Sequence, residues 1–184
     1  VRRVIERCLV RDRRERLLEI GSDGAAHYVY HLPPVREGAR ALRTREPSVD
    51  RWYYAVKANP HPRILDVIVG EGFGLECVSI AEVRAVRARF GASVPILFTP
   101  NFCPVDEYAA ALEAGAELTV DGPQVFDQAP DTFRGSALAV RLDPGTGQGH
   151  HAKVRTAGSG VKFGLPMAEL DTFAEAAERL RVRV

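Results

Sequence analysis

The stretch YYAVKANP, from Tyr53 to Pro60, determines how the rest of the chain is interpreted. Its first four residues form an apolar, β-prone run that predicts a short buried strand. Lys57 ends this run, and Asn59-Pro60 then breaks the strand. An unpaired ammonium group is costly to bury, so a lysine here either extends to water or has a chemical role. Burial or nearby cations lower a lysine's pKa, and the amine then becomes a nucleophile that forms a Schiff base with an aldehyde.

A strand–loop–helix unit repeats from Trp52 onward. Strands are predicted to begin at residues 53, 75, 94, 117 and 138, which is a period of about twenty residues. Strands that are separated by helices must be parallel, with right-handed crossovers. A further helix is predicted over residues 167–180, and a sixth strand begins at residues 181–184. Eight such units close a β/α barrel of about 250 residues, so we expect a partial barrel of five to six units.

An open, doubly wound sheet has the same period and is the alternative architecture. It favours a glycine-rich phosphate loop after the first strand, whereas residues 58–62 contain no glycine. We therefore predict an α/β fold with a partial parallel, TIM-like barrel. Residues 1–30 are predicted to form short strands of a separate β-domain, and residues 31–184 form the barrel, truncated at strand six.

Composition excludes several classes of protein. The 184 residues carry a formal net charge of +1, which gives no reason to expect nucleic acid or an anionic membrane as a partner. No run of about eighteen apolar residues is present, so no membrane span is predicted. The cysteines, Cys8, Cys77 and Cys103, are odd in number and far apart, which fits neither a disulfide framework nor a zinc site. We therefore expect a cytoplasmic protein with no metal centre.

Polar residues follow the predicted strands at the edge where parallel barrels carry their chemistry. Ser79 and Asp121 have a simple explanation as helix N-caps. Glu76 and Arg141 lie within strands, so each needs a charged partner or an aqueous cavity. The full set of candidates is Lys57, Glu76, Ser79, Thr99, Asn101, Asp121, Arg141 and Asp143.

A glycine-rich loop from Asp143 to His151 is the second unusual stretch. Its glycines permit backbone amides to converge on an anion, although the same composition is typical of a flexible surface loop. Two adjacent histidines point in different directions and are a poor signal for a metal site.

Three segments together resemble a known family. YYAVKANPHPRIL, LECVSIAEV, and RLDPGTGQGHH with VRTAGSGVKFGLP are similar to amino-acid decarboxylases that bind pyridoxal phosphate (PLP) in an alanine-racemase-type barrel. The AVKAN core is shared with ornithine and arginine decarboxylases. The glycine-histidine loop followed by KFGLP resembles the diaminopimelate decarboxylases in particular.

The resemblance implies that Lys57 carries PLP and that Glu76 and Arg141 lie close to the cofactor. The family often has a shorter aspartate at the position of Glu76. His150, Lys162 and Phe163 belong to the family-like loop, where the resemblance implies a structural or lid role. The implied enzyme is a homodimer that decarboxylates meso-diaminopimelate to L-lysine.

Several of the family's functional groups are expected after residue 184, among them the phosphate loop and the partner-subunit cysteine. We therefore expect the chain to be a fragment with little or no turnover alone. One alternative is a related decarboxylase for ornithine, arginine or a carboxylated polyamine. A second is a non-catalytic PLP-binding homologue, which the presence of Lys57 disfavours.

Overall fold

The computed structural model describes residues 13–146 and 163–184. The chain divides into two compact units, and each is described by itself. The first unit contains residues up to Asp50 together with His61–Gly72. The second contains Arg51–Pro60 and residues from Phe73 onward.

The first unit is helical over its described residues. Helix α2 spans Arg14–Ile20, a short 3-10 turn follows at Gly21–Asp23, α3 spans Leu32–Arg45 and α4 spans Pro62–Gly70. The strands predicted over residues 17–30 were therefore wrong. The stretch RERLLEI consists of residues with good helix propensity, and Arg16 pairs with Glu19 one turn away. The strand predicted over residues 4–10 lies outside the described residues.

Charged contacts join α3 to the end of α4. The Glu71 carboxylate accepts a hydrogen bond from Arg40 Nε at 2.7 Å, and Arg36 Nε lies 3.3 Å from its other oxygen. These arginines hold the pKa of the Glu71 carboxyl below its ordinary value, and the Arg40 hydrogen bond is the largest cause. Both arginines are more than half exposed, so the pairs add little to stability.

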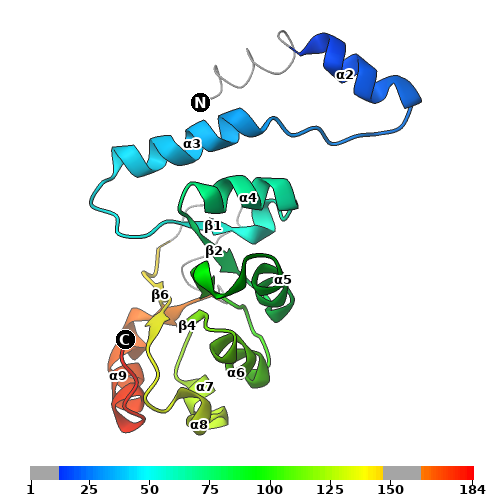
Figure 1. The fold of residues 1–184 in the computed structure, drawn as a ribbon. Helices are drawn as coiled ribbons and strands as arrows, with labels where there is room; N and C mark the ends of the chain where they lie inside the picture. Colours follow the sequence, from blue (N-terminus) through cyan, green and yellow to red (C-terminus); the bar gives the residue numbers. More distant parts are fainter. Residues whose placement is uncertain (1–12, 147–162) are drawn as a thin grey trace. The chain divides into compact units, whose positions relative to one another are not determined.

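The second unit is built on a five-stranded parallel sheet (Figure 1). The strands are β1 Tyr53–Ala55, β2 Gly74–Cys77, β3 Ile96–Phe98, β4 Glu117–Val120 and β5 Leu138–Val140. Their order in space is their order in the chain. In a doubly wound sheet the strand order reverses at a point inside the sheet. In a barrel, each new strand is added beside the previous one in a constant direction. The sheet therefore has barrel topology, as the repeat predicts.

The two faces of the sheet differ in chemistry, because side chains alternate along each strand. One face is buried in the three central strands, where it carries Leu75, Cys77, Ile96, Phe98, Leu118 and Val120. The register Ala55↔Glu76, Glu76↔Leu97 and Leu97↔Glu117 defines the opposite face, which we call the open face. Apart from buried Gly74, its residues in β2 to β5 are partly or fully exposed, and include Glu76, Leu97, Thr119 and Ala139.

Helices pack against the buried face. They are α5 Ile80–Phe90, α6 Val105–Glu113, α7 Gln124–Gln128, α8 Pro130–Phe133 and α9 Leu170–Arg179. Right-handed crossovers between successive parallel strands place these helices on one side. Their core is a chain of aromatic rings with neighbouring centroids 5.4–6.0 Å apart, formed by Phe98, Tyr108, Phe133, Phe126 and Phe173.

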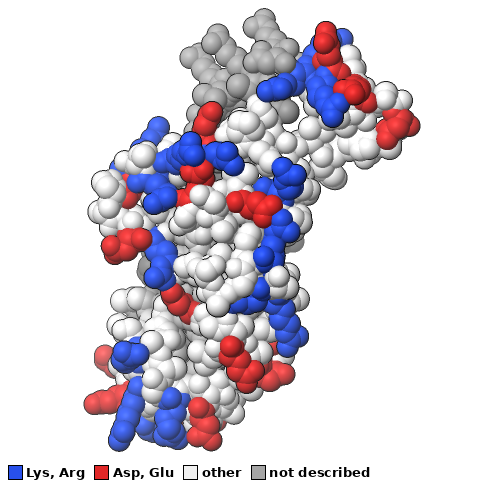
Figure 2. Space-filling model, in the orientation of Figure 1, with Lys and Arg blue, Asp and Glu red and all other residues white. Residues whose placement is uncertain are grey.

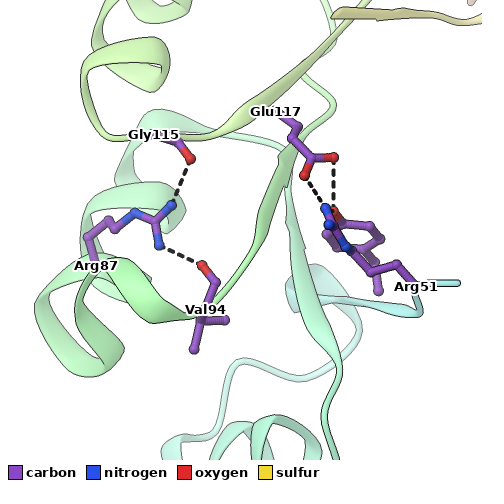
Figure 3. A network of polar contacts seen from close by, with 6 residues as sticks. Arg51, Arg87, Val94, Gly115 and Glu117 are labelled. Atoms are coloured by element: carbon purple, nitrogen blue, oxygen red, sulfur yellow. Dashed lines mark hydrogen bonds and ion pairs between the residues drawn. The ribbon is translucent and has the colours of Figure 1, made fainter.

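A polar cluster connects β1 to β4 at the edge of the sheet where the strands begin (Figure 3). On the open face, Glu117 of β4 accepts hydrogen bonds from Arg51 and from the Tyr53 hydroxyl of β1, the latter at 3.0 Å. The Tyr53 ring crosses Gly74, where a Cβ atom would lie only 2.6 Å from it. Glycine in β2 therefore lets one aromatic ring connect strands that are not neighbours.

The last residues extend the sheet as predicted. Ala137 forms a parallel bridge with Arg183, and the Leu138 amide donates to the Arg183 carbonyl at 3.0 Å. Val182–Val184 thus lies beside β5 in the position of a sixth strand. A small parallel pair, β6 Leu142–Asp143 with β7 Leu165–Pro166, was not predicted.

Charges of both signs are distributed over the described surface. Figure 2 shows lysine and arginine interspersed with aspartate and glutamate on the face in view. No helix in the described ranges is long and apolar enough to cross a membrane.

Candidate active site

The sheet brings the predicted polar residues to one edge and one face. Lys57 follows β1, Glu76 lies in β2, Thr99 follows β3, Asp121 follows β4 and Arg141 follows β5. Register and alternation place the residues after β2 to β5 on the open face, at the carboxyl ends of the strands. The Lys57 amine lies there as well, 3.8 Å from Glu76 Oε1. In parallel barrels this is the edge that carries catalytic groups.

Lys57 lies in a single 3-10 turn, Val56–Ala58, directly after β1. Buried Val56 anchors this turn to the core, and the next residue of the chain turns outward. The Lys57 side chain is 61% exposed, and its Nζ lies 3.8 Å from Glu76 Oε1. Lys57 is therefore not buried among the described residues, so one of the two conditions named for its activation is absent there. The open face leaves the amine in contact with water, and its charged neighbour is a carboxylate.

Glu76 has the charged partner that its position in a strand requires. Its side chain is only 16% exposed, it lies 3.8 Å from Lys57 Nζ, and it accepts a hydrogen bond from the Thr99 hydroxyl. The turn after β2 is fixed by Ser79, whose side chain accepts from the Glu82 amide at the start of α5. Glu82 in turn accepts from the Val78 amide at 2.8 Å. The N-cap predicted at Ser79 is confirmed, and it holds the loop beside Glu76.

Asp121 is a half-buried carboxylate with no capping role. Helix α7 is capped at Pro123 without a side-chain hydrogen bond, so the N-cap predicted at Asp121 was wrong. Burial raises the pKa of the Asp121 carboxyl, and the Arg141 charge partly opposes this shift. Asp121 and Arg141 thus form the acidic and basic components of the site beyond β4 and β5.

Arg141 is held against an aromatic ring. Its guanidinium carbon lies 4.6 Å from the centre of the Phe163 ring, a cation–π contact. The β6–β7 pair brings Phe163 there, because the Leu165 amide donates to the Arg141 carbonyl at 2.7 Å. Gly164 makes this approach possible: it has φ +82°, and a Cβ atom would lie 3.0 Å from the backbone of β6.

A cavity of about 480 Å³ lies beside Asp121. Its lining includes Cys103 and Tyr108, whose proximity is not predictable from their positions in the sequence. Burial raises the pKa of the Cys103 thiol to about 11, and it also raises the pKa of Tyr108. Burial likewise raises the pKa of the Cys77 thiol to about 12. Both thiols are therefore protonated at neutral pH, which makes them weak nucleophiles and weak metal ligands.

Two of the predicted site residues, His150 and Lys162, lie outside the described residues. Among the residues that are described, no group of three or more histidine, cysteine, aspartate or glutamate side chains is arranged to hold a metal ion. Phe163 is the site residue whose contact the sequence did not predict, because it depends on the return of the chain along β6.

Comparisons with known proteins agree with this geometry. Residues 35–184 match the model of the family described as pyridoxal-dependent decarboxylase, pyridoxal binding domain. The chain therefore belongs to the PLP-dependent decarboxylases of the ornithine, arginine and diaminopimelate type. The cofactor of this family is pyridoxal phosphate.

Individual relatives cover most of this chain. The protein TabA of Pseudomonas amygdali pv. tabaci is 36% identical over 72% of the chain, and diaminopimelate decarboxylase of Methanothermobacter thermautotrophicus is 32% identical over 77%. Ornithine decarboxylase of Leishmania donovani is 28% identical over 85%. The chain spans only 31%, 34% and 22% of these relatives, respectively.

Solved structures confirm the fold. A crystal structure of diaminopimelate decarboxylase superposes with a TM-score of 0.78 at 21% identity, over 92% of this chain and 40% of the other. This likeness establishes the α/β barrel fold predicted from the sequence.

Proposed function

We propose that the full-length protein containing this chain is an amino-acid decarboxylase in which Lys57 holds the PLP cofactor. One observation carries the proposal. The Lys57 amine lies on the open face, at the carboxyl edge of the parallel strands, 61% exposed and 3.8 Å from a carboxylate oxygen. An amine in that place is reachable by an aldehyde from solvent, and the sheet fixes its position.

The charges of the neighbouring residues complement the charged groups of such a cofactor. We propose that Arg141, held by the Phe163 ring, supplies positive charge toward an anionic group of the cofactor or substrate. Glu76 supplies a fixed negative charge beside the Lys57 amine. PLP, when bound, supplies the electron sink that makes loss of carbon dioxide feasible. The chain's own residues hold, orient and neutralise charge around it.

We propose meso-diaminopimelate as the substrate and L-lysine as the product. Support comes from the KFGLP segment at residues 162–166 and from the named diaminopimelate decarboxylase relative at 32% identity. The second candidate is decarboxylation of ornithine or a related amino acid. It is favoured by the ornithine decarboxylase relative, which aligns over a larger share of this chain at lower identity.

A substrate competition on the full-length protein tests both candidates. Meso-diaminopimelate, ornithine and arginine are supplied together with PLP, and carbon dioxide and the amine products are measured. We expect lysine to be the main product and Lys57→Ala to lower turnover at least about a thousandfold. Putrescine as the main product would support the second candidate. Undiminished turnover by Lys57→Ala would overturn the assignment of Lys57.

We also propose that the protein acts as a homodimer in the cytoplasm. The resemblance to the family supports the dimer, and the three widely spaced cysteines support a reducing compartment. Analytical ultracentrifugation of the full-length protein tests the dimer. A monomer at micromolar concentration with full activity would contradict it.

A further inference from the structure

The Glu76 carboxylate is held by a residue with no assigned role. Glu76 Oε1 accepts a hydrogen bond from the Thr99 hydroxyl, and the same oxygen faces Lys57 Nζ at 3.8 Å. That distance is longer than a hydrogen bond, so the lysine alone does not fix the carboxylate. Glutamate has three rotatable side-chain bonds, and an unheld carboxylate at an open face would turn toward water.

Thr99 is itself fixed by the sheet. Its amide donates to the Cys77 carbonyl at 2.9 Å, which continues the pairing of β3 with β2 beyond Phe98. As a β-branched residue it has few χ1 rotamers. The position of its hydroxyl, and hence of the carboxylate oxygen that it holds, follows from the strand register.

We propose that Thr99 is a positioning residue for Lys57 and acts through Glu76. Its hydroxyl keeps one carboxylate oxygen of Glu76 aimed at the Lys57 amine. A carboxylate at this distance attracts the amine and restricts its orientation. In Thr99→Val the carboxylate is released from this position, so Lys57 loses the neighbour that restrains it and reacts faster with electrophiles. The importance of this contact for the cofactor rests on the proposed function, but the contact itself does not.

The test measures Lys57 in the cofactor-free, full-length protein. A limiting amount of an N-hydroxysuccinimide ester is added, and the acylation rate of Lys57 is read from peptide masses. We expect Thr99→Val and Glu76→Gln each to raise this rate about two- to fivefold, which corresponds to the free energy of a solvent-exposed ion pair. Thr99→Ser restores the hydroxyl and should keep the wild-type rate.

Two comparisons make the result specific. Thr119→Val is the same change on the same face of the next strand, and we expect it to leave the Lys57 rate unchanged. Thr99→Val should have no further effect in a Glu76→Gln background, because its target is gone. Should Thr99→Val fail to fold by circular dichroism, Thr99→Ala against Thr99→Ser gives the same comparison.

Three outcomes would overturn the proposal. They are an unchanged rate in Thr99→Val, an effect of equal size in the Glu76→Gln background, and a failure of Thr99→Ser to restore the rate. No PLP is present in this assay. A protein that shows the expected rates but does not bind PLP would therefore refute the proposed function and leave the role of Thr99 intact.

Discussion

The Arg87 side chain joins three segments at the start of β3 and β4. Its Nε donates to the Ala114 carbonyl at 2.6 Å, and a terminal nitrogen donates to the Gly91 carbonyl at 3.0 Å. The terminal nitrogens also donate to the carbonyls of Val94 at 2.6 Å and Gly115 at 3.0 Å (Figure 3). A planar guanidinium reaches carbonyl groups in several directions, which a lysine ammonium on its stem does not. One side chain therefore connects α5 to the loops that precede two strands.

We predict that Arg87→Met lowers the free energy of unfolding by about 2–4 kcal/mol, since several carbonyls lose a charged donor. Arg87→Lys should lie between Arg87→Met and the wild type. Urea unfolding measures the effect, with Arg84→Met, an exposed position on the same helix, as the control. Equal stability of the Arg87→Met and Arg84→Met proteins would show that this network carries no energy.

Asp121 gives stability a predictable dependence on pH. Burial raises the pKa of its carboxyl above the ordinary value of 3.8, so the folded state binds this proton more tightly than the unfolded chain does. Stability from this group is greatest at low pH and is lost as the pH rises through 3.8 toward the folded pKa.

Asp121→Asn removes this component because asparagine does not titrate. We expect the variant to gain stability relative to the wild type as the pH rises from about 3.5 to about 6, measured by urea unfolding. Asp131→Asn, whose side chain is 94% exposed in the wild type, is the matched control. A flat or opposite trend for Asp121→Asn would contradict the raised pKa.

At the scale of elements, the β6–β7 pair determines where Arg141 is held. Gly164 and Gly145 both have positive φ, +82° and +76°, but only Gly164 has backbone atoms where a Cβ would lie. The two positions therefore separate conformational strain from steric clash.

We predict that Gly145→Ala costs about 1 kcal/mol of unfolding free energy, from strain alone. Gly164→Ala should cost about 2–4 kcal/mol, since the backbone of β6 or β7 must also shift. Thermal or urea unfolding of the two variants supplies the comparison. Equal losses of unfolding free energy in the two variants would mean that β7 shifts without a penalty. The fold would then not fix the Arg141–Phe163 contact.

At the scale of the whole molecule, the sequence predicted the architecture where strands and helices repeat at a regular spacing. The repeat located all five strands and their parallel direction, and it placed Lys57, Glu76 and Arg141 at the carboxyl edge. Helix α2 was mistaken for a strand because few apolar residues in a short segment do not define a period.

The contacts within the site were not predictable in the same way. The pairing of Thr99 with Glu76 depends on the register of β2 and β3, and the contact of Arg141 with Phe163 depends on a strand pair of two residues each. Register follows from which faces are buried and from the turn geometry, so it cannot be derived from the sequence of one strand alone. Exposure of Lys57 likewise depends on what covers the open face.

The proposed role of Lys57 is tested most directly by identifying the lysine that binds the cofactor. This chain contains three lysines, Lys57, Lys153 and Lys162, and a peptide map tells them apart from one another and from lysines elsewhere in the full-length protein. Full-length protein is incubated with PLP, reduced with borohydride and digested, and the modified peptide is identified by its mass. We expect a phosphopyridoxyl group on Lys57 and no labelled peptide in Lys57→Ala. Modification at Lys153 or Lys162 with Lys57 unmodified would contradict this expectation.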